Sequence, residues 1–100
     1  MSAAGQRLWL VCYDIADDKR RDQVYHLLRG AGDRMQYSVF RCALSAMQLA
    51  QLEVRLHDAI DHFEDQVMFV PLGPVDNPKS WAMHSLGRPL VTPARTVRIV

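Results

Sequence analysis

The order of apolar and polar residues predicts alternating strands and helices along the chain. Residues 8–13, LWLVCY, are apolar throughout and rich in strand-forming side chains, so we expect a strand with both faces covered. A helix is expected from about Asp18, because apolar residues then follow at helical spacing: Val24, Leu27, Leu28 and Ala31. Residues 35–44 form a second extended segment, either one bent strand or two short ones.

The second half of the chain follows with a helix and then another strand. Ser45 and Gln48 have the spacing of a capping box, which predicts the start of a second helix. Residues 66–72 are again apolar on both faces, and GPVDNP at 73–78 breaks the chain. Beyond it, SWAMHSLGRPLV and TVRIV are expected to form one or two further strands. The apolar stripe of the second helix is predicted to contain Leu49, Leu52, Leu56, Ile60 and Phe63.

This β-α-β-(β)-α-β order predicts an α+β, ferredoxin-like sandwich over residues 1–78. Residues 79–100 are expected to extend the same domain with the C-terminal strands. Right-handed crossovers place both helices on one face of the sheet. Since the strands around Val11 and Phe69 are apolar on both faces, the second face needs a cover of its own. A second copy of the chain would supply it, which predicts a homodimer with a sheet-to-sheet interface.

Composition limits the chain to one small domain of 100 residues, 49% of them apolar. No apolar run reaches the about 18 residues that span a membrane, and MSAAGQR lacks the apolar segment of a secretory signal. We therefore expect a cytoplasmic protein with no membrane partner. Cys12 and Cys42 lack zinc-site spacing and are expected to be buried thiols.

The net charge of +1 conceals an uneven distribution of charged side chains. Residues 53–65 are mostly acidic. Such a chain can present one basic and one acidic face, which suits a polyanionic partner such as nucleic acid. Half of the basic side chains lie between residues 19 and 41: Lys19, Arg20, Arg21, Arg29, Arg34 and Arg41.

Asp14 is the candidate metal ligand, because it ends the first apolar strand directly before the first helix. Mg²⁺ and Mn²⁺ prefer carboxylate oxygens, often only one or two, with waters completing the shell. A turn or helix-capping acid is the alternative, although Asp17 and Asp18 are also suitable caps. In a homodimer, two copies of Asp14 could meet near the two-fold axis, where like charges bind a cation, share a proton or stay apart in water.

Arg20, Arg21 and Arg34 are the candidate phosphate contacts. The first turn of a helix favours anions, and a guanidinium group binds phosphate through two hydrogen bonds. A solvated charged surface and ordinary strand packing explain the same residues, so this pattern alone does not choose between an enzyme and a binding module. Further along the chain, three more side chains are candidate nucleic-acid contacts through a ring or a hydroxyl: Tyr37, Ser38 and Phe40.

The stretch YDIADDKRRDQVYHLLRGAGDRMQYSVFRC resembles one family, the CRISPR-associated Cas2 proteins, the small subunits of spacer acquisition. A strand ending in Tyr-Asp-Ile, a charged helix start, a Gly-rich turn and Arg-x-Gln-Tyr-Ser-Val-Phe occur in the order and at the separations of that family. The match is specific over residues 8–44 and continues in pattern through VMFVPLG.

The resemblance implies that Asp14 is the metal-binding, catalytic aspartate and that Arg21 and Arg34 serve nuclease function. It places Phe40 at the aromatic of the QYSVF motif, and Gln23 where some members carry another arginine. It implies a homodimer that hydrolyses RNA or double-stranded DNA with Mg²⁺. It also implies an adaptation complex in which two dimers of the integrase Cas1 flank one dimer of this protein on DNA.

Three alternatives stay open at this point. A non-catalytic adaptor would bind duplex DNA through its basic surface and pair TVRIV with the integrase by β-augmentation. A related toxin-type ribonuclease would share the fold. A single-strand binder of the RRM type would use Trp9, Tyr13 and Tyr37 on one exposed sheet face. A sheet-to-sheet dimer would cover that face.

Overall fold

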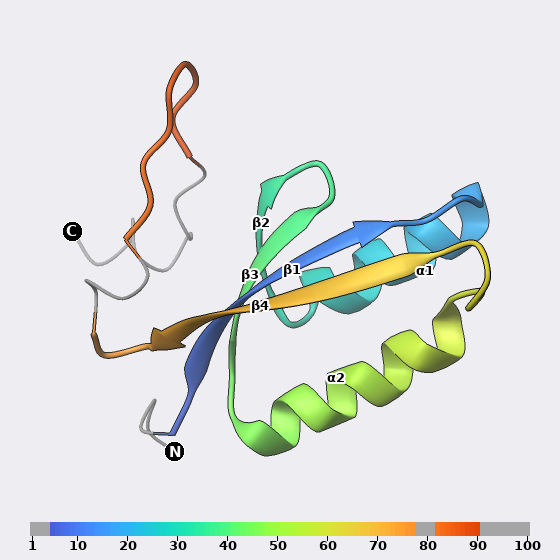
Figure 1. Cartoon of the computed structure of the whole chain (residues 1–100), viewed down its shortest axis with the longest axis horizontal. Coiled ribbons are helices and arrows are strands. Elements are labelled where there is room, and N and C mark those ends of the chain that lie inside the picture. Colours follow the sequence, from blue (N-terminus) through green and yellow to red (C-terminus); the bar gives the residue numbers. More distant parts are fainter. Residues whose placement is uncertain (1–4, 78–81, 91–100) are drawn as a thin grey trace.

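The computed structural model in Figure 1 describes residues 5–77 and 82–90. Its four strands form one antiparallel sheet in the order β2-β3-β1-β4. Each helix joins two strands that flank a third, which is the predicted ferredoxin-like arrangement. The elements are β1 (Arg7–Asp14), α1 (Asp18–Arg29), β2 (Gly32–Gln36), β3 (Val39–Leu44), α2 (Ala46–Ala59) and β4 (Gln66–Pro74).

The second extended segment is a hairpin of two strands, which answers the question left open by its sequence. Tyr37 and Ser38 form the turn between β2 and β3. β2 begins at Gly32, three residues earlier than expected, where the backbone passes very close to β3. A Cβ atom on Gly32 would overlap the carbonyl oxygen of Arg41 and lie 2.7 Å from Sγ of Cys42.

Both helices begin where the sequence predicts. The Asp17 carboxylate caps α1 by accepting the backbone N–H of Arg20 at 3.0 Å. At α2, the Ser45 hydroxyl accepts the backbone N–H of Gln48 at 3.2 Å, and the Gln48 side chain accepts that of Ser45 at 2.8 Å. The capping box is therefore confirmed.

The end of α2 corrects the predicted apolar stripe. The helix ends at Ala59, and Ile60 has an extended backbone. The Asp61 carboxylate then accepts the backbone N–H groups of Phe63 and Glu64, which stabilises a turn in place of another helical turn. Phe63 is consequently fully exposed rather than part of the core.

The hydrophobic core lies between the sheet and the two helices. Figure 1 shows α1 and α2 packed on one side of the strands, as expected from right-handed crossovers. Cys42 is buried there, and burial, followed by the charge of Asp33, raises the pKa of its thiol to about 12. The buried cluster comprises Val11, Tyr13, Ile15, Val24, Leu28, Phe40, Cys42, Leu44, Leu52, Leu56 and Ala59.

The opposite face of the sheet, the open face, is also apolar. Because side chains alternate along a strand, the neighbours of core residues in β1, β3 and β4 point away from the helices. These neighbours, which include Arg41, are half-buried, except that Met68 is 51% exposed and that Asp14 and Gln66 at the strand ends are exposed. No helix of the described chain covers them. The open face contains Leu10, Cys12, Val39, Met68 and Val70.

The C-terminal strands are not seen in the part of the chain that is described. Residues 82–90 are irregular, with Gly87 at a φ of +89° and a bond from the Ser85 hydroxyl to the Arg88 carbonyl at 2.8 Å. The strand expected over this stretch is therefore wrong there, because a tight turn interrupts it. TVRIV lies outside the described residues. Neither described helix has the length and apolar character needed to cross a membrane.

Candidate metal and phosphate site

Asp14 is the last residue of β1 and lies at one end of the open face. It is opposite Gln66, the first residue of β4, and its side chain is exposed. Cys12 precedes it on the same face, whereas Tyr13 points into the core. The carboxylate therefore stands at the rim of the apolar surface that lacks a helix.

A single exposed carboxylate fits a magnesium ion, which binds one or two protein carboxylates and keeps several waters. Among the residues that are described, no three His, Cys, Asp or Glu side chains gather into a metal site. Asp14 is one exposed carboxylate that such an ion could take as a protein ligand at this end of the sheet.

The loop between Asp14 and α1 is held by Asp65, a residue that the sequence did not indicate. Its side chain is completely buried. The carboxylate accepts the backbone N–H of Ala16 at 2.9 Å and that of Asp61 at 2.8 Å, and it pairs with Arg20. The hydrogen bond from Arg20, followed by these backbone donors, holds the pKa of Asp65 well below its usual range. Because Arg20 and Asp65 are 45 residues apart, the sequence gave no local signal of their contact.

Arg20, a predicted phosphate contact, is instead occupied by acids of the loop before β4. Its Nε lies 2.7 Å from Asp65 Oδ2, and its Nη2 lies 3.2 Å from Glu64 Oε1. The hydrogen bond to Asp65 raises the pKa of Arg20 further above its ordinary value. Arg20 therefore uses its Nε and Nη2 groups to connect α1 to the α2–β4 loop.

Arg21 and Arg34, in contrast, line one small pocket of about 270 Å³ between α1 and the β2–β3 turn. Arg21 pairs with the exposed Asp18 and donates a second bond to the Ile15 carbonyl at 3.0 Å. The structure thus brings together two of the three predicted arginines. The other lining residues are Tyr13, Asp18, Asp22, Tyr25 and Tyr37, and they do not include Asp14.

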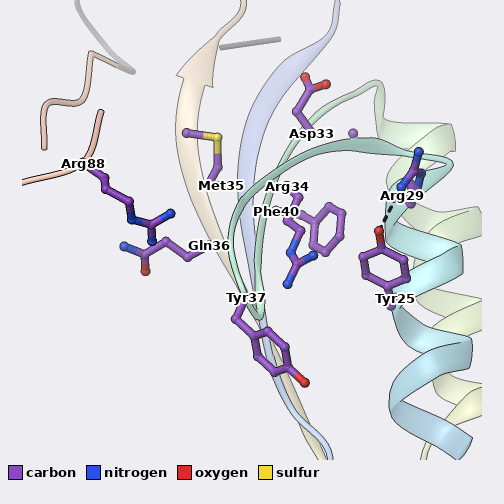
Figure 2. Close-up of a pocket in the computed structure, with 10 residues that line it drawn as sticks. Tyr25, Arg29, Asp33, Arg34, Met35, Gln36, Tyr37, Phe40 and Arg88 are labelled. Atoms are coloured by element: carbon purple, nitrogen blue, oxygen red, sulfur yellow. Dashed lines mark hydrogen bonds between the residues drawn. The ribbon is translucent and has the colours of Figure 1, made fainter. Parts of the chain in front are cut away.

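Arg34 lies between two tyrosine rings. Its guanidinium carbon is 5.4 Å from the ring centroid of Tyr25 on α1 and 5.3 Å from that of Tyr37 in the turn. Figure 2 shows the guanidinium between these rings, with Arg29 bonded to the Tyr25 hydroxyl. A wider groove of about 890 Å³ continues from the pocket along β2, past Arg29 and Arg88.

Phe40 and Ser38 differ in what they can offer to a nucleic acid. Phe40 is completely buried against the rings of Tyr13 and Tyr25, so the prediction that it stacks a base is wrong, because the ring has no exposed surface. Ser38 is half-buried in the hairpin turn, and its carbonyl accepts the backbone N–H of Tyr13 at 3.0 Å. The exposed aromatic of this motif is Tyr37, at 69%.

Together these features define a class of protein: a ferredoxin-like α+β domain with one carboxylate at a strand end and a pocket of arginines and tyrosines. Residues 7–79 match the family described as CRISPR associated protein Cas2. The chain belongs to this family.

Individual relatives agree with this membership. The CRISPR-associated endoribonuclease Cas2 3 of Synechocystis sp. is 45% identical over 65 residues, which are 65% of this chain and 71% of that protein. The crystal structure of Streptococcus pyogenes Cas2 has a TM-score of 0.68 and 30% identity, covering 80% of this chain and 99% of that one. A chain of a partial Cas6-RT-Cas1–Cas2 complex has a TM-score of 0.66 and 27% identity, with coverages of 80% and 90%.

Proposed function

We propose that this protein is a CRISPR adaptation subunit that acts as a homodimer and cleaves phosphodiester bonds with the help of Mg²⁺ or Mn²⁺. One observation carries the proposal: the exposed Asp14 carboxylate stands at the end of an apolar sheet face that no described helix covers. The similarity to a protein named an endoribonuclease supports a nuclease in general terms. RNA and double-stranded DNA are both candidate substrates.

The dimer follows from the open face. Half-buried Leu10, Val39 and Val70 share this face with the more exposed Met68 on the edge strand β4, and a second copy would remove them from water. A two-fold pairing uses the same face of both copies. Asp14 of each copy then approaches the axis, so two carboxylates share one cation instead of repelling each other.

The residues of this chain have separate tasks in the proposed reaction. The two Asp14 carboxylates would hold a divalent cation, which would supply positive charge beside the phosphoryl group. Arg21 and Arg34 bind phosphate groups of the strand and stabilise the charge that develops on them. Asp65 keeps the loop between Asp14 and Arg21 in place through Ala16 and Arg20.

The test is cleavage of RNA and of duplex DNA by Asp14→Asn protein over a magnesium titration. We expect cleavage to fall at least about 100-fold, because the amide removes the charge that holds the cation. Affinity for the uncut strand should be retained, since Arg21 and Arg34 are unchanged. Asp58→Asn, which alters an exposed acid on α2, is the matched control and should cut normally. Wild-type rates for Asp14→Asn would show the mechanism to be wrong.

A second candidate function is a non-catalytic adaptor that bridges Cas1 dimers on DNA. The likeness to a chain from a Cas1–Cas2 complex favours it, as does the exposed position of Arg34. Such a protein binds duplex DNA without cutting it, and the logarithm of its affinity falls linearly with the logarithm of salt concentration. Arg34→Ala should reduce the magnitude of this slope by about one, as expected for the loss of one phosphate contact. An unchanged slope would remove Arg34 from the DNA interface.

A further inference from the structure

The environment of Arg34 differs from that of the other two arginines predicted to bind phosphate. Arg20 and Arg21 each pair with a carboxylate. Within the described chain, no acidic oxygen lies at ion-pair distance from Arg34. Its guanidinium carbon instead lies over the rings of Tyr25 and Tyr37, 5.4 and 5.3 Å from their centroids. A guanidinium carries five N–H donors, so Arg34 keeps donors for an anion beside these two rings.

The hydroxyl of Tyr25 is arranged to donate. Arg29 Nη1 donates to the Tyr25 oxygen at 2.9 Å, which leaves the phenolic hydrogen for another acceptor. This bond from Arg29, together with the charges of Arg29 and Arg34, lowers the pKa of Tyr25. A more acidic phenol is a better donor to an oxyanion. The ring of the same residue lies beside Arg34, and both residues line the same pocket.

Tyr37 is placed differently. It is the exposed side chain of the hairpin turn, and its backbone carbonyl accepts the Tyr13 hydroxyl at 3.3 Å. That bond anchors the turn to β1, so the backbone of Tyr37 is held in place and its ring stays beside Arg34. The small pocket and the wider groove share Tyr25, Arg34 and Tyr37. The three residues therefore stand where the two hollows meet.

We propose that Tyr25, Arg34 and Tyr37 form one binding unit for a phosphodiester group. The edge of Arg34 and the hydroxyl of Tyr25 are its two donors, while Tyr37 is a positioning residue that acts through its ring. The assignment rests on the proposed function, in that the phosphodiester belongs to a nucleic-acid strand. It adds residues Tyr25 and Tyr37 to the interface, and it gives them separable chemical roles.

The experiment measures the affinity of the full chain for a short duplex DNA and for a single-stranded RNA of the same sequence, without divalent metal. Tyr25→Phe should weaken binding about tenfold, because it removes one donor to a charged oxygen and keeps the ring. Tyr37→Phe should bind like wild type, whereas Tyr37→Leu should bind about threefold more weakly, since only the latter removes the ring beside Arg34. In an Arg34→Ala background, Tyr37→Leu should have no further effect.

Arg55→Ala removes an exposed charge from α2 and is the control for Arg34→Ala. Thermal unfolding identifies any variant that fails to fold, and Tyr25→Phe conserves the packing of the ring. Wild-type affinity for Tyr25→Phe overturns the inference, as does a full Tyr37→Leu effect in the Arg34→Ala background, which would indicate independent base stacking. If the wild type binds neither probe, the proposed function itself fails. If Arg34→Ala weakens binding but Tyr25→Phe does not, only this inference fails.

Discussion

At the residue scale, three arginines of similar sequence context have three different environments. Arg20 is paired with two acids from a distant loop, Arg21 with an acid one helical turn away, and Arg34 with two aromatic rings. A guanidinium paired with carboxylates offers less to a phosphate than one held by rings. We therefore expect the partner of each arginine, more than its position in a basic stretch, to set its capacity to bind a phosphate group.

The free energy of unfolding should depend on pH because of Asp65. Its pKa is held below the ordinary carboxyl value of about 3.9, so the unfolded chain takes up a proton first as the pH falls. The contribution to folding is complete above about pH 5 and is lost as the pH falls toward the folded pKa. Urea unfolding from pH 7 down to about pH 3 should show a falling midpoint for wild type.

Two variants check the assignment to Asp65. Asp65→Asn should be less stable at neutral pH, because it leaves Arg20 with Glu64 alone, and its midpoint should change less with pH. Asp58→Asn alters an exposed acid and should keep the wild-type pH dependence. Equal pH dependence for Asp65→Asn and wild type would assign the acid sensitivity to other carboxyls.

At the element scale, β2 needs a residue without a side chain where it begins. The backbone of Gly32 lies against β3, and a Cβ atom there would collide with the Arg41 carbonyl and with Cys42. Gly32→Ala should therefore destabilise the fold by about 1–3 kcal/mol, as overpacking does, in chemical unfolding experiments. Gly30→Ala is the control, because its Cβ would be 3.6 Å from the nearest atom and its backbone is helical. Equal stability of the two variants would contradict this account of β2.

The end of α2 shows how a local bond overrides an apolar pattern. The periodic sequence continues through Phe63, yet the helix stops four residues earlier. Asp61 binds the backbone N–H groups that would follow, and Asp65 in turn binds the N–H of Asp61. Periodicity identifies the buried face of a helix, whereas its last residue depends on such bonds.

At the scale of the whole molecule, the open face should make the protein a dimer. Met68→Glu places a charge at an exposed position of this face, and a charge there cannot be buried without a partner. We expect a monomer by analytical ultracentrifugation, together with the loss of any metal-dependent cleavage, because the two Asp14 side chains separate. Met47→Glu, at a more exposed methionine on α2, should remain a dimer. A dimeric Met68→Glu protein would place the interface elsewhere.

Up to residue 74, the sequence by itself determined the order of the elements, except for the division of the second extended segment into β2 and β3, as well as the two helix starts and the position of Asp14 at a strand end. These features depend on short-range causes: side-chain periodicity, a capping acid and a capping box. The fold class then followed from the limited number of ways in which such elements can pack. A motif also marked Arg34 and Phe40, although without showing which of the two reaches the surface.

Only the tertiary structure decided which of these side chains are available for chemistry. It buried Phe40 in the core, occupied Arg20 with Asp65, and placed Arg34 between Tyr25 and Tyr37. Apart from the contact of Arg34 with Tyr37 in the same hairpin, these contacts join separate elements of the fold, and no local pattern encodes such a pairing. Availability for binding is a property of neighbours in space, which is why it becomes visible only once the sheet and helices are assembled.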